Sequence, residues 1–242
     1  MVDAMLKTAL IPLVLSFIIT SCSAAHKTFV ASDFKTQDFA QATLAIAPLM
    51  TQPPIEISDE IKSMLTLQIS ENLYDAFIQD GLPLSLKQVC DFKHIETGTY
   101  KAIPALETRL LTLPDGSLMS AAVPMETVHF DSFDADYILF LENLHAIVEK
   151  DRIENSDPRK SLTVSGIVER DATYKYLRGY KFYFAQYGFY TIFDNRSREL
   201  VSYGKIACKT LLKNGPPRVV LEEAMADLSR KLSDNAPFKK TK

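Results

Sequence analysis

The spacing of apolar residues predicts a strand and a long helix near the start of the chain and a second helix at its end. Residues 42–49 form a short apolar run closed by a proline, as expected for a buried strand. Between Ser58, a suitable N-cap, and Gly81, a suitable end, apolar side chains recur at every fourth position. This spacing predicts one helix that packs a single face on a sheet. A similar apolar stripe after Pro216 and Pro217 predicts the last helix.

The middle of the chain has patterns typical of strands. Residues 136–141 place apolar side chains on both faces, whereas apolar and polar residues alternate over 144–149. This change predicts a strand that leaves the core and exposes one side. Residues 162–168, after a polar loop, are its expected antiparallel neighbour.

A densely aromatic run over 174–193 predicts half of a β-hairpin. It is followed by the sequence Asp-Asn-Arg-Ser at 194–197, which suits a turn, and by a second apolar run at 199–208. Because a strand of about twenty residues would exceed the usual length of three to ten, we expect a bend or break near Gly179 or Gly188.

The remaining elements give an α+β fold. Residues 84–92 alternate weakly and are interpreted as a strand, and residues 105–111 as a short helix. The predicted architecture is a mainly antiparallel sheet with helices packed on one face, in two layers. We expect one domain over 42–236 and a flexible tail at 237–242.

The N-terminus has the features of a lipoprotein signal. Residues 8–19 form a mostly apolar run that is too short to cross a bilayer of about 30 Å but suits a signal peptide. The following sequence, Ile-Thr-Ser-Cys at 19–22, resembles the bacterial lipobox. This resemblance implies a signal peptide at 1–21, acylation of Cys22 and a lipidated tether at 22–41. An ordinary secretory signal with an incidental cysteine is the alternative.

Acylation would determine where the protein is found. One fatty chain anchors only reversibly, so the three chains of a bacterial lipoprotein would hold the protein firmly on a membrane leaflet. Ser23, which follows the cysteine, is not the aspartate that commonly retains such proteins at the inner membrane. We therefore expect a lipid-anchored protein on the periplasmic side of a Gram-negative outer membrane.

Four features, over most of residues 42–235, resemble a group of envelope lipoprotein domains. They are LAIAPL before the long helix, DADYILFLENL, YTIFDNRSRELVSYGKI, and the closing helix. The group includes the TolB amino-terminal domain, the curli-secretion channel lipoprotein and the lipoprotein activators of penicillin-binding proteins. The resemblance implies a domain that binds other envelope proteins or assembles, without catalysis. The chain lacks the long amphipathic hairpins of channel-forming members, so no pore is expected.

Composition and charge exclude several function classes. Hydrophobic residues make up 47% of the chain and charged residues 24%, as in ordinary globular domains. The net charge of −3, with no long basic run, argues against binding of nucleic acid. Only eight glycines are present, which argues against phosphate-binding loops.

The sequence offers little evidence of catalysis. Its four histidines are not at metal-ligand spacings, and no hydrolase, zinc-protease or nucleotide-binding motif occurs. The acidic cluster at 129–136 suggests either a calcium or zinc site or, as we favour, a turn in which Asp134 or Asp136 caps backbone amides. We predict no catalytic residue, no metal and no cofactor.

The aromatic run is the leading candidate for a binding surface. It holds six of the ten tyrosines, and alternation along a strand would place aromatic side chains on both faces. Tyr183, Tyr187 and Phe189 are all at odd positions and therefore share one face of the strand, which we expect to be the outer face. Either the run is a central strand with hydroxyls reaching solvent, or its outer face binds a protein or a glycan.

Two cysteines remain once Cys22 is acylated. In an oxidising compartment Cys90 and Cys208 could form a disulfide, and the alternative is that both are buried free thiols.

The sequence thus predicts a non-catalytic, lipid-anchored envelope protein that binds a protein partner in envelope assembly, secretion or cell-wall synthesis. The alternatives are a ligand- or glycan-binding lipoprotein that uses the aromatic hairpin and a lipid-anchored hydrolase.

Overall fold

The computed structural model describes residues 28–64, 69–131, 133–152, 180–212, 216–234 and 236–240. Within them, seven strands form one sheet in the order β1-β9-β8-β7-β2-β4, with β3 paired to β7 further along that strand. The strands of this sheet are β1 (Thr28–Val30), β2 (Thr43–Ile46), β3 (Ile55–Glu56), β4 (His94–Thr97), β7 (Tyr137–Arg152), β8 (Tyr180–Asp194) and β9 (Leu200–Leu211). A separate two-stranded sheet contains β5 (Leu106–Thr112) and β6 (Leu118–Pro124).

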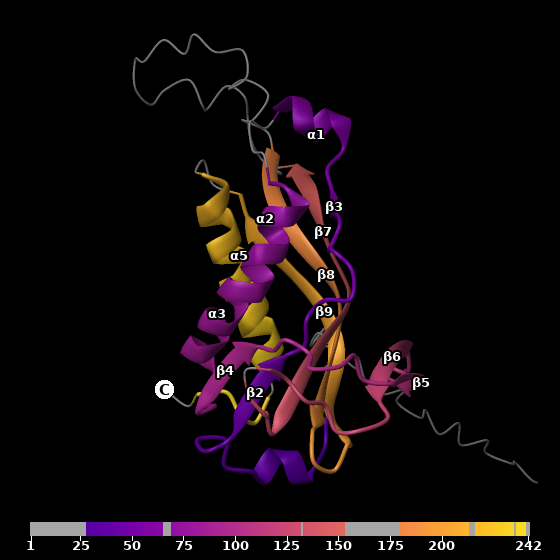
Figure 1. Ribbon diagram of the computed structural model, residues 1–242. Coiled ribbons are helices and arrows are strands. Elements are labelled where there is room, and N and C mark those ends of the chain that lie inside the picture. Colours follow the sequence, from indigo (N-terminus) through magenta and orange to yellow (C-terminus); the bar gives the residue numbers. More distant parts are fainter. Residues whose placement is uncertain are drawn as a thin grey trace, which may run out of the picture.

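Helices lie mainly on one side of this sheet, and the β5–β6 hairpin lies on the other (Figure 1). The helices are the 3-10 helix η1 (Asp33–Thr36), α1 (Asp59–Met64), α2 (Glu71–Ala76), the π-helix η2 (Phe77–Gly81), α3 (Leu82–Val89) and α5 (Pro217–Ser233). The helix after Pro216 and the hairpin of β8 and β9, both predicted from the sequence, are confirmed.

The predicted fold class is wrong. Strands hold more of the described chain than helices, and the large sheet is mixed: β2 runs parallel to both β4 and β7, and β3 runs parallel to β7. Parallel neighbours arise because the chain crosses over the sheet through α2 and α3 between β2 and β4, a connection long enough for that geometry. The two-layer expectation also fails, because the β5–β6 hairpin adds a layer on the opposite face.

Three local predictions are corrected. Residues 84–92 lie largely in helix α3, and residues 105–111 lie largely in strand β5. Gly81 does not end a helix, since α2, η2 and α3 follow one another without interruption. A methyl group on Gly81 would lie 3.3 Å from the Phe77 ring and 3.4 Å from the Met225 side chain of α5, so Gly81 faces α5 across a normal packing distance.

The main core lies between the sheet and the helices. Tyr74, Ile78, Leu82 and Leu86 are buried along the α2–η2–α3 run, at the spacing expected of one helical face. A polar link crosses this core: the Tyr74 hydroxyl donates to Gln186 Oε1 at 2.9 Å, and Gln186 Nε2 donates to the carbonyl oxygen of Ala224 at 3.0 Å. The link joins α2, β8 and α5.

A β-bulge keeps apolar residues of β7 on the helical side. The pairing register with β8 shifts between Glu142 and His145, and Asn143 has a φ of 50°. Leu139 precedes this shift and Val148 follows it with opposite parity, yet both belong to the core under the helices. Gly188 lies opposite, where a methyl group would be 3.0 Å from the Glu142 carbonyl oxygen. The expected break near Gly188 is therefore a bulge in the partner strand, and β8 itself is continuous.

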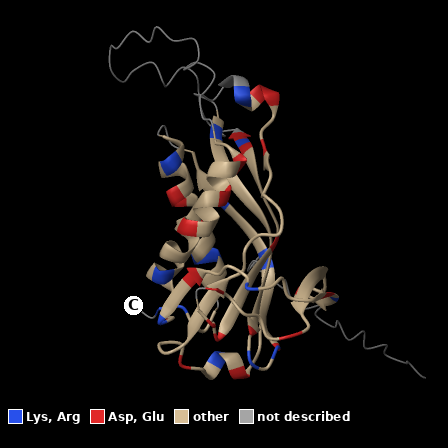
Figure 2. Ribbon diagram, in the orientation of Figure 1, with Lys and Arg blue, Asp and Glu red and all other residues tan. Residues whose placement is uncertain are grey.

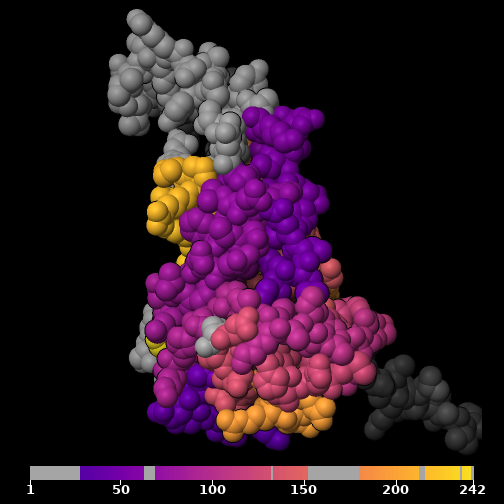
Figure 3. Space-filling view, viewed as in Figure 1, coloured from indigo at the N-terminus to yellow at the C-terminus, as the bar shows by residue number. Residues whose placement is uncertain are grey.

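On the other face, the hairpin and its flanking loops cover one end of the long strands. They form a continuous mass, magenta to pink, over the lower part of the molecule in Figure 3. Met119 and Ala121 of β6 pack against Phe189 of β8, and Phe130 belongs to a second cluster with Phe193. Apolar residues on both faces of 136–141 are explained by this double cover.

Both ends of the domain extend further than predicted. Residues 28–30 of the expected tether pair with β9, and Phe34 and Phe39 are buried in the main core. Phe238, in the expected flexible tail, is also buried there and packs edge-on against Phe34. Residues 28–30 are ordered by backbone pairing with β9, whereas Phe34, Phe39 and Phe238, which follow no periodic pattern, fill the end of the main core.

Candidate functional site

The end of the sheet that the hairpin does not cover presents side chains from three neighbouring strands. We call this surface the open sheet face. Tyr183 and Tyr187 of β8 are half-buried there, while Lys209 and Leu211 of β9 are exposed. Cross-strand pairing brings these residues together, since Tyr183 lies opposite Leu211 and also opposite Glu149 of β7. The central parts of the long strands are mostly uncharged, whereas acidic and basic residues mix along the helices (Figure 2).

A hydrogen-bonded network is already formed on this face. The Tyr187 hydroxyl donates to Glu149 Oε1 at 2.6 Å, and Lys209 Nζ lies 2.5 Å from Glu149 Oε2. The His145 ring lies 5.7 Å from that of Tyr187, between centroids. Both carboxylate oxygens of Glu149 are thus engaged, which fixes the orientation of the tyrosine and the lysine.

The pKa values of this network follow from its contacts. Burial disfavours the charged form of Glu149, but hydrogen bonds from Lys209 and Tyr187 outweigh it, so the pKa of Glu149 lies below its ordinary value. The hydrogen bond to Glu149 raises the pKa of Tyr187 and also that of Lys209. At neutral pH the network holds an ion pair and a neutral tyrosine.

The structure separates the three aromatic residues predicted as a binding surface. All three lie on the face opposite the helices, as their shared parity required. Tyr183 and Tyr187 belong to the open sheet face, but Phe189 packs beneath the β5–β6 hairpin against Leu113 and Met119. Phe189 is therefore a packing residue, a correction to the sequence-based expectation. Tyr174 and Tyr176 of the aromatic run lie outside the described residues.

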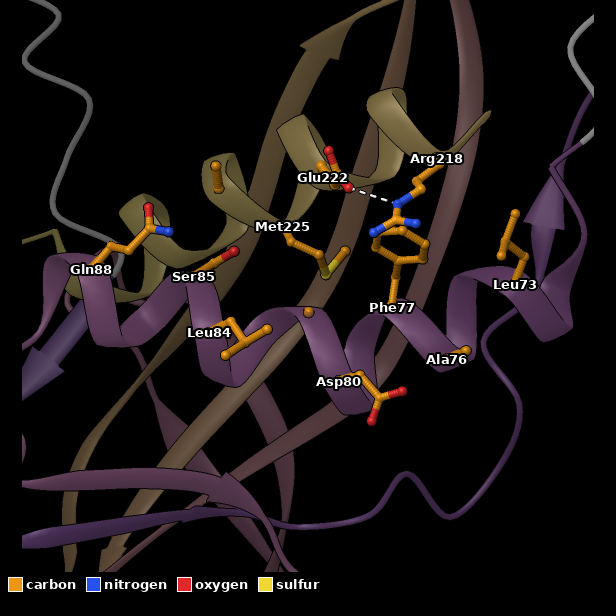
Figure 4. A pocket seen from close by; sticks show the side chains of 12 residues that line it. Leu73, Ala76, Phe77, Asp80, Leu84, Ser85, Gln88, Arg218, Glu222 and Met225 are labelled. Atoms are coloured by element: carbon orange, nitrogen blue, oxygen red, sulfur yellow. Dashed lines mark hydrogen bonds and ion pairs between the residues drawn. The ribbon is translucent and has the colours of Figure 1, made fainter. Parts of the chain in front are cut away.

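A second feature, not predicted from the sequence, is a groove between two helical segments (Figure 4). Its volume is about 600 Å³, and Phe77 of η2 and Met225 of α5 point into it. Leu84, at its rim, is 67% exposed. Arg218 Nε donates to Glu222 Oε1 at 2.9 Å along α5. The twelve residues that line the groove are Leu73, Ala76, Phe77, Asp80, Gly81, Leu84, Ser85, Gln88, Arg218, Glu222, Met225 and Ala226.

Sequence reasoning missed this groove because it assigned residues 84–92 to a strand. If residues 84–92 are taken as a helix, Leu84 and Gln88 lie one turn apart and on the same side as Phe77. The available sequence signal was that Leu84 lies outside the apolar stripe that contains Ile78, Leu82 and Leu86.

The two cysteines are free in the structure and have different neighbours. Cys90 follows α3 and forms a backbone bridge with Lys239, whereas the Cys208 sulfur accepts a hydrogen bond from Gln186 Nε2 at 3.5 Å. Burial raises the pKa of each thiol to about 12. The structure thus has two free thiols, of which Cys90 is buried and Cys208 is half-buried. Cys22, the predicted acylation site, lies outside the described residues.

The acidic cluster around Asp136 supports the fold through hydrogen bonds. Asp136 Oδ2 accepts from the backbone nitrogen and the hydroxyl of Thr43, each at 3.0 Å, and its Oδ1 accepts from Arg196 at 2.8 Å. Nearby, His129 Nδ1 lies 3.4 Å from Asp134 Oδ1. No group of three or more potential metal-binding side chains occurs among the residues that the structure describes.

No protein-family model matches the chain, and no curated protein matches it. Among solved structures, it is similar to a Helicobacter pylori protein described as a homolog of the neuraminyllactose-binding hemagglutinin. The match covers 82% of this chain and 84% of that chain, with 12% identity and a TM-score of 0.34. A TM-score this low does not establish a shared fold, so nothing about ligands follows from it. No helix in the described part of the chain has the length and apolar character needed to span a membrane.

Proposed function

We propose that this chain is a non-catalytic lipoprotein whose domain binds a protein partner of the cell envelope through the open sheet face. The observation that supports the proposal most directly is the group of half-exposed tyrosines, Tyr183 and Tyr187, on an end of the sheet that the β5–β6 hairpin leaves uncovered. Tyrosine is enriched at protein interfaces, where its apolar ring packs and its hydroxyl finds a polar partner.

The network around Glu149 suits such an interface. A partner that covers the open sheet face would remove water from Glu149 and Lys209, but these two charges already compensate each other. Burying a charge without a partner is costly, and this pairing reduces that cost. Leu211, 39% exposed, adds apolar area beside Tyr183.

Photo-crosslinking tests the surface. A photoreactive amino acid in place of Tyr183 should yield a covalent adduct with an envelope protein in living cells. The same amino acid in place of Arg230, which is exposed on α5, is the matched control and should yield none. Equal adducts from both positions, or none from position 183, would contradict the proposal.

The proposed address rests on the lipobox at Cys22, with the protein facing the periplasm from a Gram-negative outer membrane. Cys22→Ala should abolish incorporation of a fatty-acid analogue and release the protein from the membrane fraction. Equal labelling of both forms would refute acylation at this residue. Partners in envelope assembly, secretion or cell-wall synthesis are accessible from that location.

The groove between the helices favours a second candidate function, binding of a small amphipathic ligand. Its volume falls within the range of about 300–1,000 Å³ typical of ligand sites, and an apolar floor of Phe77 and Met225 adjoins the Arg218–Glu222 ion pair. A ligand with an apolar chain and a polar head fits this distribution. A fluorescent fatty acid should bind the wild type, and Ala76→Trp, which narrows the groove from an exposed position, should weaken that binding. Unchanged binding in the variant would exclude the groove as the site.

A further inference from the structure

The outer face of the β5–β6 hairpin is uncharged, and the part nearest the turn is exposed. Met119 and Ala121 of β6 point toward the large sheet and are buried. Leu118, the first residue of β6 after the turn, is 57% exposed. In β5, Leu110 is 68% exposed. Pairing of Leu110 with Ser120, and of Thr112 with Leu118, places these residues on one face. The exposed outward positions of the two strands are Thr108, Leu110, Thr112, Leu118 and Ser120. Leu106 and Ala122 share this face and are half-buried, and Pro124, opposite Leu106, is buried.

The charged residues of β5 have the other parity. Glu107 and Arg109 form an ion pair with each other and alternate with the outward positions. On soluble domains, neighbouring apolar residues that are exposed together can mark contact with another protein or with a membrane.

The start of the described chain lies beside this hairpin. Phe29 of β1 pairs with Tyr203 of β9, and their rings stack with centroids 4.7 Å apart. The Tyr203 hydroxyl donates to the carbonyl oxygen of Thr112 in β5 at 3.0 Å. Contacts therefore run without interruption from β1 to the end of β5.

The length of the preceding chain limits the distance to the proposed anchor. Cys22 precedes Thr28, the first residue of β1, by six residues. An extended chain spans at most about 3.6 Å per residue, so Cys22 lies within roughly 22 Å of Thr28. An acylated Cys22 would hold this end of the domain, and with it the hairpin, at the membrane surface.

We propose that the outer face of the β5–β6 hairpin contacts the lipid bilayer beside the acylated Cys22, which rests on the lipid anchor proposed above. Leu110 and Leu118 enter the interfacial region, and Thr108, Thr112 and Ser120 meet the headgroups. The three acyl chains already anchor the protein firmly, so added apolar contact of this kind chiefly orients the domain on the bilayer. The open sheet face, further along the same strands, remains available to a partner.

A single tryptophan can report this contact, because the natural chain contains none. Leu118→Trp and, as the matched control, Tyr183→Trp are introduced into the mature chain. Cys22 is coupled to a maleimide-bearing lipid in vesicles of phosphatidylethanolamine and phosphatidylglycerol. Cys90 and Cys208 react slowly, because burial raises the pKa of both thiols to about 12.

The two positions should behave differently on vesicles. We expect Leu118→Trp to emit at shorter wavelength and to be quenched by brominated lipid, while Tyr183→Trp stays open to aqueous acrylamide. Adding Leu110→Asp to Leu118→Trp should abolish the lipid quenching, because a carboxylate resists entry into the interface. Full acrylamide access for Leu118→Trp on vesicles would overturn the proposal.

The alternative occupant and the anchor are tested separately. A shift of Leu118→Trp emission that needs no vesicles and grows with protein concentration would assign the face to a second copy of the chain and overturn bilayer contact. Because the anchor is coupled chemically, the result does not depend on acylation in the cell. Mass measurement of wild-type Cys22 then decides acylation independently.

Discussion

On the face of β7, β8 and β9 that lies opposite the helices, the two ends of the same strands differ in what covers them. At the covered end, Phe189 and Phe193 lie beneath the β5–β6 hairpin and its loops. At the open end, Tyr183 and Tyr187 lie at the same face with no strand of that hairpin above them. The same alternation of side chains therefore produces core at one end and a candidate binding surface at the other.

Two glutamates of β7 show what the cover changes. Glu142, at the covered end, accepts a hydrogen bond from the Ala122 backbone nitrogen at 2.9 Å, and its Oε1 is buried without a partner among the described residues. Burial raises its pKa, although the Ala122 hydrogen bond opposes this. Glu149, at the open end, has both oxygens engaged and a lowered pKa. The hairpin thus determines whether a carboxylate on this face is destabilised or stabilised as an anion.

The largest expected difference between the two ends concerns stability. Phe193 is 1% exposed and packs edge-on against Phe140, so Phe193→Ala should cost about 3–5 kcal/mol of unfolding free energy. Tyr183→Ala, at the half-buried open end, should cost less than about 1 kcal/mol. Urea unfolding of both variants measures these values. Similar costs for the two would show that the open end is also core.

The next largest effect concerns partner capture. Tyr187→Ala should weaken capture of the crosslinked partner about thirtyfold, which corresponds to the roughly 2 kcal/mol lost at an interface hot spot. Tyr187→Phe keeps the ring but loses the hydrogen bond to Glu149, so it should retain most of the binding and serves as the control. Pull-down titration together with melting curves separates binding from stability. Lost stability with intact capture would place the interface elsewhere.

The sequence predicted the alternation of β8 but not what covers it. The even positions of the strand lie under the helices, as the bulk of Phe182 and Phe184 indicated. Residues 105–111 showed no strand pattern because Arg109 and Leu110 are both exposed, and only pairing with β6 makes the segment a strand. The alternation of side chains along β8 predicted which tyrosines lie on the open sheet face. Phe189 has the same alternation but is covered by the hairpin, and this long-range packing is not visible in any local sequence pattern.

The groove between the helices also depends on long-range packing that the sequence pattern does not predict. Its walls, the α2–η2–α3 run and α5, are far apart in sequence, and the apolar pattern of each predicts only burial of one face. The space between them is set by tertiary packing, with Gly81 and Met225 both lining it. The apolar stripe of α5 was predicted, but its distance from another helix could not be.

The smallest effect is a pair of opposite pH dependences at the two ends. The folded pKa of Glu142 lies above its ordinary value of 4.5, so its stabilising contribution is present below that pH and is lost as the pH rises through the folded pKa. The folded pKa of Glu149 lies below 4.5, so its contribution is present above that pH and is lost as the pH falls through the folded pKa. Glu142→Gln should therefore gain stability relative to the wild type as the pH rises above 4.5. Glu149→Gln should be less stable than the wild type above pH 4.5, and this difference should shrink as the pH falls below 4.5. Because Glu149 is only partly buried, its effect should stay below about 1 kcal/mol. Unfolding in urea across this pH range measures both, and shifts of the same sign would mean that the hairpin does not separate the two environments.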